Sequence, residues 1–389
     1  MSAARRVVVC FHEPHLGGAT RSVERIVPLL REMGWEFSFW VHRPSELHEE
    51  LAGRGWDVDG EPRCIEYSVR AWRLPPGARR RLSEVPGYVS RFDAFLRERS
   101  PDLVHANSVL TLAEALIASR RGHAVLLHAH EMLLPNVRGR LLRRTAWRHL
   151  DQVVAVSQAS AAAMAHDGRM PRIVYEAAPV PERQVTVRER PHPFTVGTVA
   201  VVSTRKGSDL FVEAARLLGE RSVNGDFRFE MVGAPSDAIE RDWAHSVLDR
   251  AKGIGITHVP SANVFERFAE WDAFVLPSRA DPFPIAMLEA MASGLPVVGV
   301  RRDGIAEQVI PGAGVLVEPE DARALADGIA WIAGQGPDVR SRLGDRARER
   351  VAQSFTIRHQ AEAMDAAYQA TLDAHAARAA SEGRSRASA

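Results

Sequence analysis

The amino-acid sequence predicts an α/β protein with two doubly wound domains, each built on a parallel sheet. Three observations lead to this prediction. Apolar runs of strand length alternate with segments of helical periodicity, this alternation restarts after a proline-rich stretch, and the 389 residues are enough for two domains of ordinary size. Strands that alternate with helices form parallel sheets covered on both faces, and ligands bind such sheets at the carboxyl ends of their strands.

The first half of the chain predicts the first domain, residues 1–180. Residues 7–11 are an apolar run of strand length, and residues 20–33 carry their apolar side chains on one helical face. The strands expected next are residues 37–41, 102–105, 124–128 and 152–157, with helices at 89–98 and 110–120 between them.

The second half predicts a linker, a second domain and a final helix. Residues 181–193 are rich in proline and lack apolar periodicity, which is typical of a linker. The second domain, residues 194–355, is expected to contain strands at 194–199, 227–232, 256–259, 273–276, 297–300 and 314–317. The last helical pattern, residues 356–380, is expected to cross back to the first domain. The small, polar tail 381–389 predicts disorder.

The composition is that of a soluble globular protein, with 46% hydrophobic and 25% charged residues. A formal net charge of +1 gives no reason to expect nucleic acid as a partner. The two cysteines, Cys10 and Cys64, cannot build a disulfide framework or a zinc cluster, and they favour a reducing cytoplasm. No signal-peptide core precedes the first strand, no apolar run reaches about 18 residues, and no cofactor is indicated.

The most informative stretch is residues 277–290, where two carboxylates lie eight positions apart. The apolar run 273–276 predicts a strand, and Pro282 and Pro284 prevent a helix from starting before about Ile285. Asp281 and Glu289 therefore flank a junction between a strand and a helix. Acids in this position suit the binding of sugar hydroxyls, while the helix N-terminus faces a phosphate.

A second candidate site is the loop Thr204-Arg205-Lys206-Gly207, which follows a predicted strand and precedes a helix. Lysine occurs only at Lys206 and Lys252 in a chain otherwise rich in arginine, which draws attention to this position. The alternative is an ordinary basic turn.

Glycines and histidines mark the ends of strands in the first half. Gly17 and Gly18 would let the backbone approach a phosphate or an acceptor closely, although they do not form a Gly-x-Gly-x-x-Gly fingerprint and a plain turn is the alternative. His128 and His130 are two positions apart at the end of one strand, so they share a face. His105 ends a neighbouring strand. A zinc site would need a third ligand that the sequence does not nominate.

These motifs together resemble the retaining glycosyltransferases of family 4, which have the GT-B fold, and the match covers nearly the whole chain. In that family a Glu-x7-Glu motif contacts the donor sugar with its first acid and the nucleotide ribose with its second, and Asp281 and Glu289 stand in those places. The resemblance assigns Arg205 and Lys206 to the nucleotide diphosphate and His130 to the reacting sugar.

The resemblance also implies the remaining roles. His130, Lys206, Arg205 and Asp281 are the expected catalytic residues. The expected donor-binding residues are Gly17, Gly18, Arg205, Lys206, Asp281, Phe283, Ile285 and Glu289. His105 and His128 are candidates on the acceptor side. Donor and acceptor are expected in a central cleft between the two domains.

The implied reaction moves a sugar from a nucleotide diphosphate-sugar to an acceptor hydroxyl, with retention at the anomeric carbon and without a bound metal. Three features depart from the family pattern: the first acid is Asp281, Pro282 and Pro284 replace glycines, and Glu176 replaces the usual Asn near the domain junction. Two alternatives remain open, a nucleotide-sugar epimerase of the same fold and a non-catalytic partner subunit that binds nucleotide-sugars.

For three further patterns we favour a structural explanation over a functional one. Asp57-Val58-Asp59 matches a metal-binding Asp-x-Asp but follows a turn at the start of a short strand. Arginines between residues 70 and 81 surround two prolines in a predicted loop and would meet a charged acceptor or simply solvent. Arginines 138, 140, 143, 144 and 148 form the basic face of a helix. That face predicts either a solvated amphipathic helix or peripheral contact with the inner face of a membrane.

Overall fold

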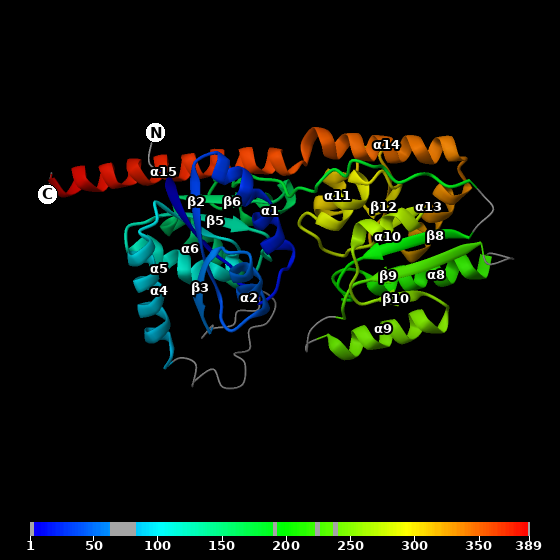
Figure 1. Cartoon of the computed structure of the whole chain (residues 1–389), viewed down its shortest axis with the longest axis horizontal. Helices are drawn as coiled ribbons and strands as arrows, with labels where there is room; N and C mark the ends of the chain where they lie inside the picture. Colours follow the sequence, from blue (N-terminus) through cyan, green and yellow to red (C-terminus); the bar gives the residue numbers. More distant parts are fainter. Residues whose placement is uncertain (1–3, 63–82, 190–192, 222–225, 236–239, 388–389) are drawn as a thin grey trace. The chain divides into compact units, whose positions relative to one another are not determined.

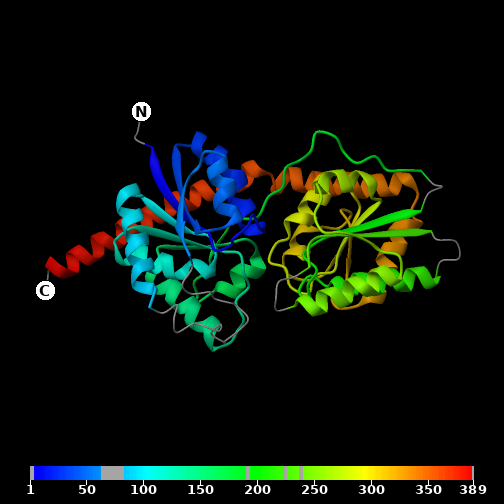
Figure 2. The same cartoon turned by 60° about the horizontal axis from the view of Figure 1, so that its bottom comes forward.

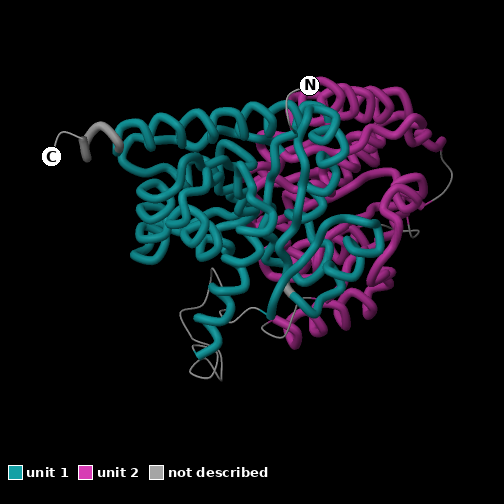
Figure 3. Tube along the Cα trace, turned by 60° about the vertical axis from the view of Figure 1, so that its left-hand side comes forward, with its two compact units in different colours: residues 1–175, 358–389 teal, residues 176–357 magenta. Residues whose placement is uncertain are grey.

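The computed structural model describes residues 4–62, 83–189, 193–221, 226–235 and 240–387. The chain forms two compact units, unit 1 with Met1–Tyr175 and Arg358–Ala389, and unit 2 with Glu176–Ile357 (Figure 3). The arginines expected in a loop between residues 70 and 81 lie outside the described residues. Within the described part, no helix is both long enough and apolar enough to cross a membrane.

Unit 1 is built on a seven-stranded parallel sheet with the order β3-β2-β1-β4-β5-β6-β7 (Figure 1). The strands are β1 (Arg5–Cys10), β2 (Trp35–His42), β3 (Asp57–Glu61), β4 (Leu103–Ala106), β5 (Ala124–Ala129), β6 (Gln152–Ala155) and β7 (Arg172–Ile173). The strand order reverses between β1 and β4, which is the topological switch point where ligands bind such sheets. The predicted doubly wound parallel sheet is confirmed.

Helices cover this sheet and bury its apolar strands. They are α1 (Gly18–Glu32), α2 (Glu46–Gly53), α4 (Val85–Arg99), the 3-10 turn η1 (Val109–Thr111), α5 (Leu112–Arg120), α6 (Val137–His149) and α7 (Gln158–Met164). Side chains that the sequence placed just before helices act as caps: Asn136 accepts from the Gly139 amide, and Ser157 and Ser160 form a capping box at α7.

Unit 2 repeats the architecture with a six-stranded parallel sheet of order β10-β9-β8-β11-β12-β13. Its strands are β8 (Phe194–Val199), β9 (Phe227–Val232), β10 (Thr257–Val259), β11 (Ala273–Leu276), β12 (Val297–Val300) and β13 (Val315–Val317). Its helices are α8 (Ser208–Arg221), α9 (Arg241–Gly253), α10 (Val264–Glu270), α11 (Ile285–Ala292), α12 (Asp303–Gln308), α13 (Ala322–Gly334) and α14 (Pro337–Ser354). Helices lie on both faces of the sheet (Figure 2), and β8 and β11 meet at its switch point.

The last helix, α15 (Ile357–Ala387), runs along unit 1 (Figure 1). Trp35 donates to Asp365 at 2.7 Å, and the Trp35 and Tyr368 rings meet edge to face with centroids 5.1 Å apart. These contacts agree with the expected return to the first domain. The structure differs at the end of the helix, which continues through Ala387 where the sequence predicted a disordered tail after Ala380. A nucleated helix propagates without an apolar face, so periodicity alone sets its end too early.

The proline-rich segment also differs from a free linker. Val185 donates its amide to Ser293 at 2.8 Å, and Gln184 donates to Asp345 at 2.7 Å. Just before the segment, Ala178 donates its amide to the Phe355 carbonyl at 3.0 Å. Residues from Glu176 onward therefore belong to unit 2 rather than to an independent connection.

Candidate active site

The loop between β8 and α8 is held against the end of β11 by a glycine. Gly207 has a φ of +68°, and a Cβ atom added there would lie 2.1 Å from the carbonyl oxygen of Pro277. Any other residue would be strained and would push the two loops apart. Arg205 reinforces the contact, because its carbonyl accepts the Arg279 amide at 2.8 Å and its guanidinium donates to the Ala280 carbonyl at 3.1 Å. The two motifs singled out in the sequence thus lie together in unit 2.

Lys206 and Asp281 form an ion pair in which the ammonium lies 2.5 Å from the carboxylate oxygen Oδ2. Ser278 donates its hydroxyl to the same oxygen at 3.2 Å, and Arg205 lies 4.0 Å from Oδ1. Burial lowers the pKa of Lys206 below 10.5. The negative charge of Asp281 opposes this shift, and the positive charge of Arg205 adds to it. The loop therefore presents two cations and a carboxylate at one point.

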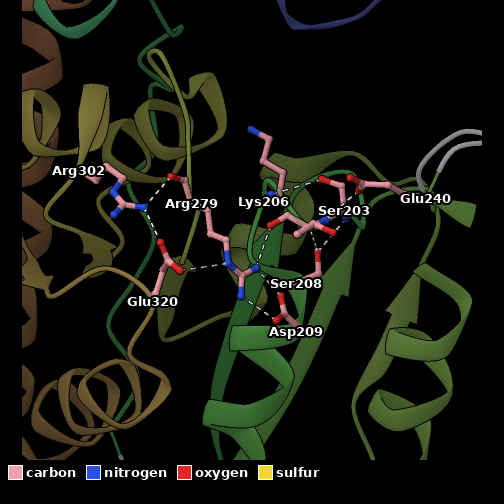
Figure 4. Close-up of polar contacts among 9 residues, drawn as sticks. Ser203, Lys206, Ser208, Asp209, Glu240, Arg279, Arg302 and Glu320 are labelled. Atoms are coloured by element: carbon pink, nitrogen blue, oxygen red, sulfur yellow. Dashed lines mark hydrogen bonds and ion pairs between the residues drawn. The ribbon is translucent and has the colours of Figure 1, made fainter. Parts of the chain in front are cut away.

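Arg279 ties the loop of Lys206 to the loop of Asp281 (Figure 4). Its guanidinium donates to both oxygens of Asp209 at 2.7 and 2.8 Å, and also to the Thr204 carbonyl at 2.9 Å. This two-point geometry is the strong form of an arginine–carboxylate pair. It raises the pKa of Arg279 and lowers that of Asp209, although burial works against both shifts. Figure 4 shows the Lys206 side chain extending away from this pair.

A second pair of side chains completes the network around Arg279. Arg302 donates to the Arg279 carbonyl at 3.0 Å and to Glu320 at 3.0 Å, and Glu320 lies 4.0 Å from Nε of Arg279 (Figure 4). The network links the segments after β8, β11, β12 and β13. No motif in the sequence marks any of its members, because side chains spread over these segments form no local pattern.

Helix α11 begins where the prolines predicted it would, with Pro284 at the N-cap position and Ile285 as its first residue. No side chain caps this end and no acid occupies its first turn. The first amides of a helix have no partner inside the helix, so this end favours an anion. Glu289 is buried on the same helix, and Phe283 is buried against the Phe355 ring, with centroids 5.2 Å apart.

Asp303, which was not among the expected site residues, is a neighbour of Asp281. It has a φ of +49°, which is rare for a residue other than glycine, and its carboxylate accepts the Asp281 amide at 3.3 Å. The next residue, Gly304, donates its amide to the Asp281 carbonyl at 3.2 Å and has no room for a side chain beside Pro282. Burial raises the pKa of Asp303. The consecutive Asp303 and Gly304 after β12 were the feature of the sequence that could have indicated this contact.

In unit 1 the carboxylate of Glu13 lies against the loop of Gly17 and Gly18. Gly17 is the N-cap of α1, and a Cβ added to it would lie 2.3 Å from an oxygen of Glu13. Thr20 donates its hydroxyl to Glu13 at 2.8 Å, whereas a Cβ added to Gly18 would meet nothing. Gly17 and Gly18 belong to unit 1, whereas the other expected donor-binding residues belong to unit 2.

His130 follows β5 and is oriented by Asn107. Nε2 of His130 lies 2.8 Å from Oδ1 of Asn107, and the Asn107 amide nitrogen donates to the Ala19 carbonyl at 3.0 Å. Because an amide oxygen only accepts, this contact assigns the imidazole proton to Nε2. The neighbouring Glu131 accepts from Ser108 and from the Val109 amide, and burial raises its pKa. The side chains of Asn107, Ser108, His130 and Glu131 thus gather at the carboxyl ends of β4 and β5.

His105 and His128 do not line an accessible surface, which corrects their assignment to the acceptor side. Both are fully buried, with ring centroids 5.4 Å apart. Nδ1 of His105 lies 2.8 Å from the Tyr368 hydroxyl, and the His128 ring lies 4.1 Å from that of His130. Burial lowers the pKa of His105 to about 3 and that of His128 well below 6.5. They form a neutral row between His130 and α15.

The Asp-x-Asp pattern is part of β3. Asp57 is engaged by Arg99 at 2.7 and 2.8 Å, and the hydrogen bond from Arg99 lowers its pKa. Asp59 lies 3.5 Å from Arg43. An arginine with two hydrogen bonds to a carboxylate takes the place that a cation would need. In the described part of the chain, no cluster of three potential metal ligands was found.

Comparison with known proteins identifies relatives of both units. The family model of the glycosyl transferases group 1 matches residues 182–350, and that of glycosyltransferase family 4 matches residues 16–176. The putative colanic acid biosynthesis glycosyltransferase WcaL of Salmonella typhimurium is 33% identical over 176 residues, 42% of either chain. The D-inositol 3-phosphate glycosyltransferase of Paenarthrobacter aurescens is 30% identical over 145 residues, 36% of this chain and 35% of the relative. These matches span about two-fifths of the relatives' length.

Solved structures resemble nearly the whole chain. Anabaena HepE in complex with UDP and glucose has a TM-score of 0.76 at 18% identity, covering 93% of this chain and 99% of that one. The sucrose-phosphate synthase of Thermosynechococcus elongatus has a TM-score of 0.75 at 20% identity, covering 95% and 100%. At such identities the likeness concerns the fold, and it confirms the predicted GT-B class.

Proposed function

We propose that this chain, which belongs to the family 4 and group 1 glycosyltransferases, transfers a sugar with retention from a nucleotide diphosphate-sugar to an acceptor hydroxyl. One observation carries the proposal. The Lys206–Asp281 pair lies in the same unit as the uncapped N-terminus of α11, which begins four residues after Asp281. A cation and a free helix end suit a diphosphate, and a carboxylate suits the sugar bonded to it.

The proposed role of Lys206 and Arg205 is to stabilise the leaving group. The departing nucleoside diphosphate gains negative charge as the bond from the anomeric carbon to its oxygen breaks. Fixed cations aimed at that charge stabilise the transition state more than the ground state. With these two charges, neutralisation would not require a divalent ion, so we propose transfer without a metal. Activity that survives an excess of chelator is the expected result.

Asp281 and Glu289 are the proposed contacts for the hydroxyls of the donor. Both are buried acids in unit 2, and a carboxylate accepts two hydroxyl hydrogen bonds without a charged partner on the ligand. We assign Asp281 to the sugar and Glu289 to the ribose. The amides of Phe283 and Ile285 would complete the wall of the site, since Pro282 and Pro284 have no N–H to offer.

His130 is the residue of unit 1 that we propose to act on the reacting sugar. With its proton on Nε2 and its ring held by Asn107, it would orient the sugar or polarise a sugar hydroxyl. As the donor bond breaks, the acceptor oxygen bonds to the same face of the anomeric carbon. The acceptor proton passes to the leaving phosphate oxygen, so that nucleoside diphosphate and glycoside are the only products. Retention follows from attack on the face that the leaving group vacates.

The experiment that tests this proposal is a donor panel with two readouts. Nucleotide-sugars that bind raise the thermal unfolding temperature of the full chain, and those that react release nucleoside diphosphate only when an acceptor is present. Conversion of the donor to an epimer without an acceptor would instead identify an epimerase. Stabilisation by donors with neither hydrolysis nor transfer over a broad acceptor panel would identify a binding subunit.

A further inference from the structure

Helix α6 presents large apolar side chains to solvent. Val137 and Leu141 are 64% and 61% exposed, and Leu134, just before the helix, is 54% exposed. Among the described residues, seven large hydrophobic side chains are at least 42% exposed, and three of them fall within residues 134–141. Scattered exposed hydrophobics need no explanation, but a cluster on one segment marks a surface that meets something apolar.

The same face carries positive charge. From residue 132 to residue 150 the chain contains five arginines and no acid. Arg140, Arg144 and Arg148 are exposed, and no carboxylate of the described residues pairs with them. With 3.6 residues per turn, Val137, Leu141, Arg144 and Arg148 share one side of the helix.

The opposite side of α6 fixes this orientation. Gly139 and Ala146 are buried, and a Cβ added to Gly139 would lie 2.0 Å from the Leu134 carbonyl. Trp147 packs on the core of unit 1 and donates to the Met164 carbonyl at 2.8 Å. Arg143 donates to the Ala163 carbonyl at 3.0 Å. The helix therefore cannot turn its apolar side chains inward.

We propose that this face, made of Leu134, Val137, Arg140, Leu141, Arg144 and Arg148, docks unit 1 on an anionic lipid bilayer. A helix that lies in the membrane–water interface inserts its apolar side chains among the lipids, while its arginines contact the lipid phosphates. A solvated amphipathic helix explains the arginines but not the three exposed apolar side chains. An acidic protein would match the charge, but the cluster of aliphatic side chains among unneutralised arginines favours a lipid interface.

The location of the face bears on the proposed acceptor. Leu134 follows His130 by four residues, so the docking segment starts at the loop that carries the proposed catalytic histidine. If the proposed transfer is correct, docking would bring His130 close to an acceptor held in the membrane. The docking itself does not depend on the transfer, and vesicle binding tests it without any assay of activity.

The experiment is co-sedimentation of the full chain with vesicles of phosphatidylcholine, alone or with about 30 mol% phosphatidylglycerol. The wild-type chain should bind the anionic vesicles about tenfold or more tightly than the neutral ones, and high salt should remove the difference. Arg140→Glu/Arg144→Glu should lose at least about tenfold in partitioning, since each basic residue near the surface contributes roughly fivefold. Val137→Ser/Leu141→Ser should also bind more weakly.

Two matched controls keep the test specific. Arg342→Glu/Arg346→Glu reverses two exposed arginines with the same spacing on α14, and Trp331→Ser removes an exposed apolar side chain from α13. Both should bind like the wild-type chain, and all variants should unfold at its temperature. The proposal is overturned if wild-type chain does not bind anionic vesicles or if the controls lose as much as the α6 variants. Binding to an acidic polymer such as heparin, without binding to vesicles, would also overturn it.

Discussion

The ammonium of Lys206 lies 2.5 Å from the carboxylate of Asp281, although 75 positions separate the two residues in the chain. The family resemblance implies that Lys206 contacts the diphosphate and Asp281 the sugar, and the structure joins the two side chains in one ion pair. A change in either residue must therefore alter the other. This coupling makes the pair the best place to test the account.

Lys206→Ala should lower the turnover number by about 10²–10³, the range for losing one preorganised electrostatic donor. The matched control is Lys252→Ala, because Lys252 is the only other lysine of the chain and is exposed on α9. Its turnover should equal that of the wild-type chain. Steady-state assays with a saturating donor make the comparison. Turnover near wild type for Lys206→Ala would remove Lys206 from the mechanism.

The alkaline limb of the rate profile should report the pKa of Lys206. The lysine is charged below its pKa, so turnover should fall as the pH rises through that value, which burial places below 10.5. Asp281 opposes the lowering, so Asp281→Asn should move the limb to still lower pH. The exposed Asp242→Asn on α9 is the control and should leave the limb in place. An unmoved limb in Asp281→Asn would show that Lys206 does not set it.

The Arg279–Asp209 pair should act on turnover by positioning Lys206. Arg279→Ala and Asp209→Ala should each lower kcat by about tenfold to a hundredfold, the cost of misplacing a catalytic group by about an ångström. The exchanged variant Arg279→Asp/Asp209→Arg should recover part of the loss, because the pair reforms in reverse. The control is Arg221→Ala, which breaks the exposed pair with Asp327 in the same unit. Equal losses in the exchanged and single variants would contradict a positioning role.

The buried histidines should make the chain less stable in acid. Unfolded histidines take up a proton near pH 6.5, whereas folded His105 does so only near pH 3 and folded His128 well below 6.5. The contribution of these two histidines to the free energy of unfolding is therefore fully present above pH 6.5. It is lost as the pH falls below that value, by about 1.4 kcal/mol per pH unit for each histidine. Urea unfolding of His128→Leu should show a slope shallower by that amount.

The control for acid stability is His245→Leu, since His245 is exposed on α9 and folding leaves its ring in water. Its slope should match that of the wild-type chain. The comparison concerns slopes, so any uniform loss of stability in a variant does not affect it. An unchanged slope in His128→Leu would mean that His128 carries a proton in the folded chain.

The sequence predicted the features that are local. Apolar runs of strand length, the prolines before Ile285 and the glycine after Lys206 each act within a few residues, so the two sheets, the start of α11 and the loop of Lys206 could be read directly. The neighbourhood of Lys206 and Asp281 also followed, because carboxyl ends of parallel strands share one edge. The roles of these residues in donor binding remain predictions.

The sequence did not predict features that depend on distant partners. His105 ended a strand like a site residue, but Tyr368, 263 positions away, covers it. Asp209 and Arg279 looked like ordinary helix and loop residues until folding placed them in contact. The helical end of α15 was missed because it lacks the apolar periodicity on which the prediction relied.

The measurement that tests the central claim most directly is acceptor-dependent release of nucleoside diphosphate from a donor that stabilises the chain, with the anomeric configuration of the product determined by NMR. We expect release only with an acceptor, a product that keeps the donor's configuration, and a loss of about 10²–10³ in Lys206→Ala but not in Lys252→Ala. An inverted product, or equal release from Lys206→Ala and the wild-type chain, would contradict the account.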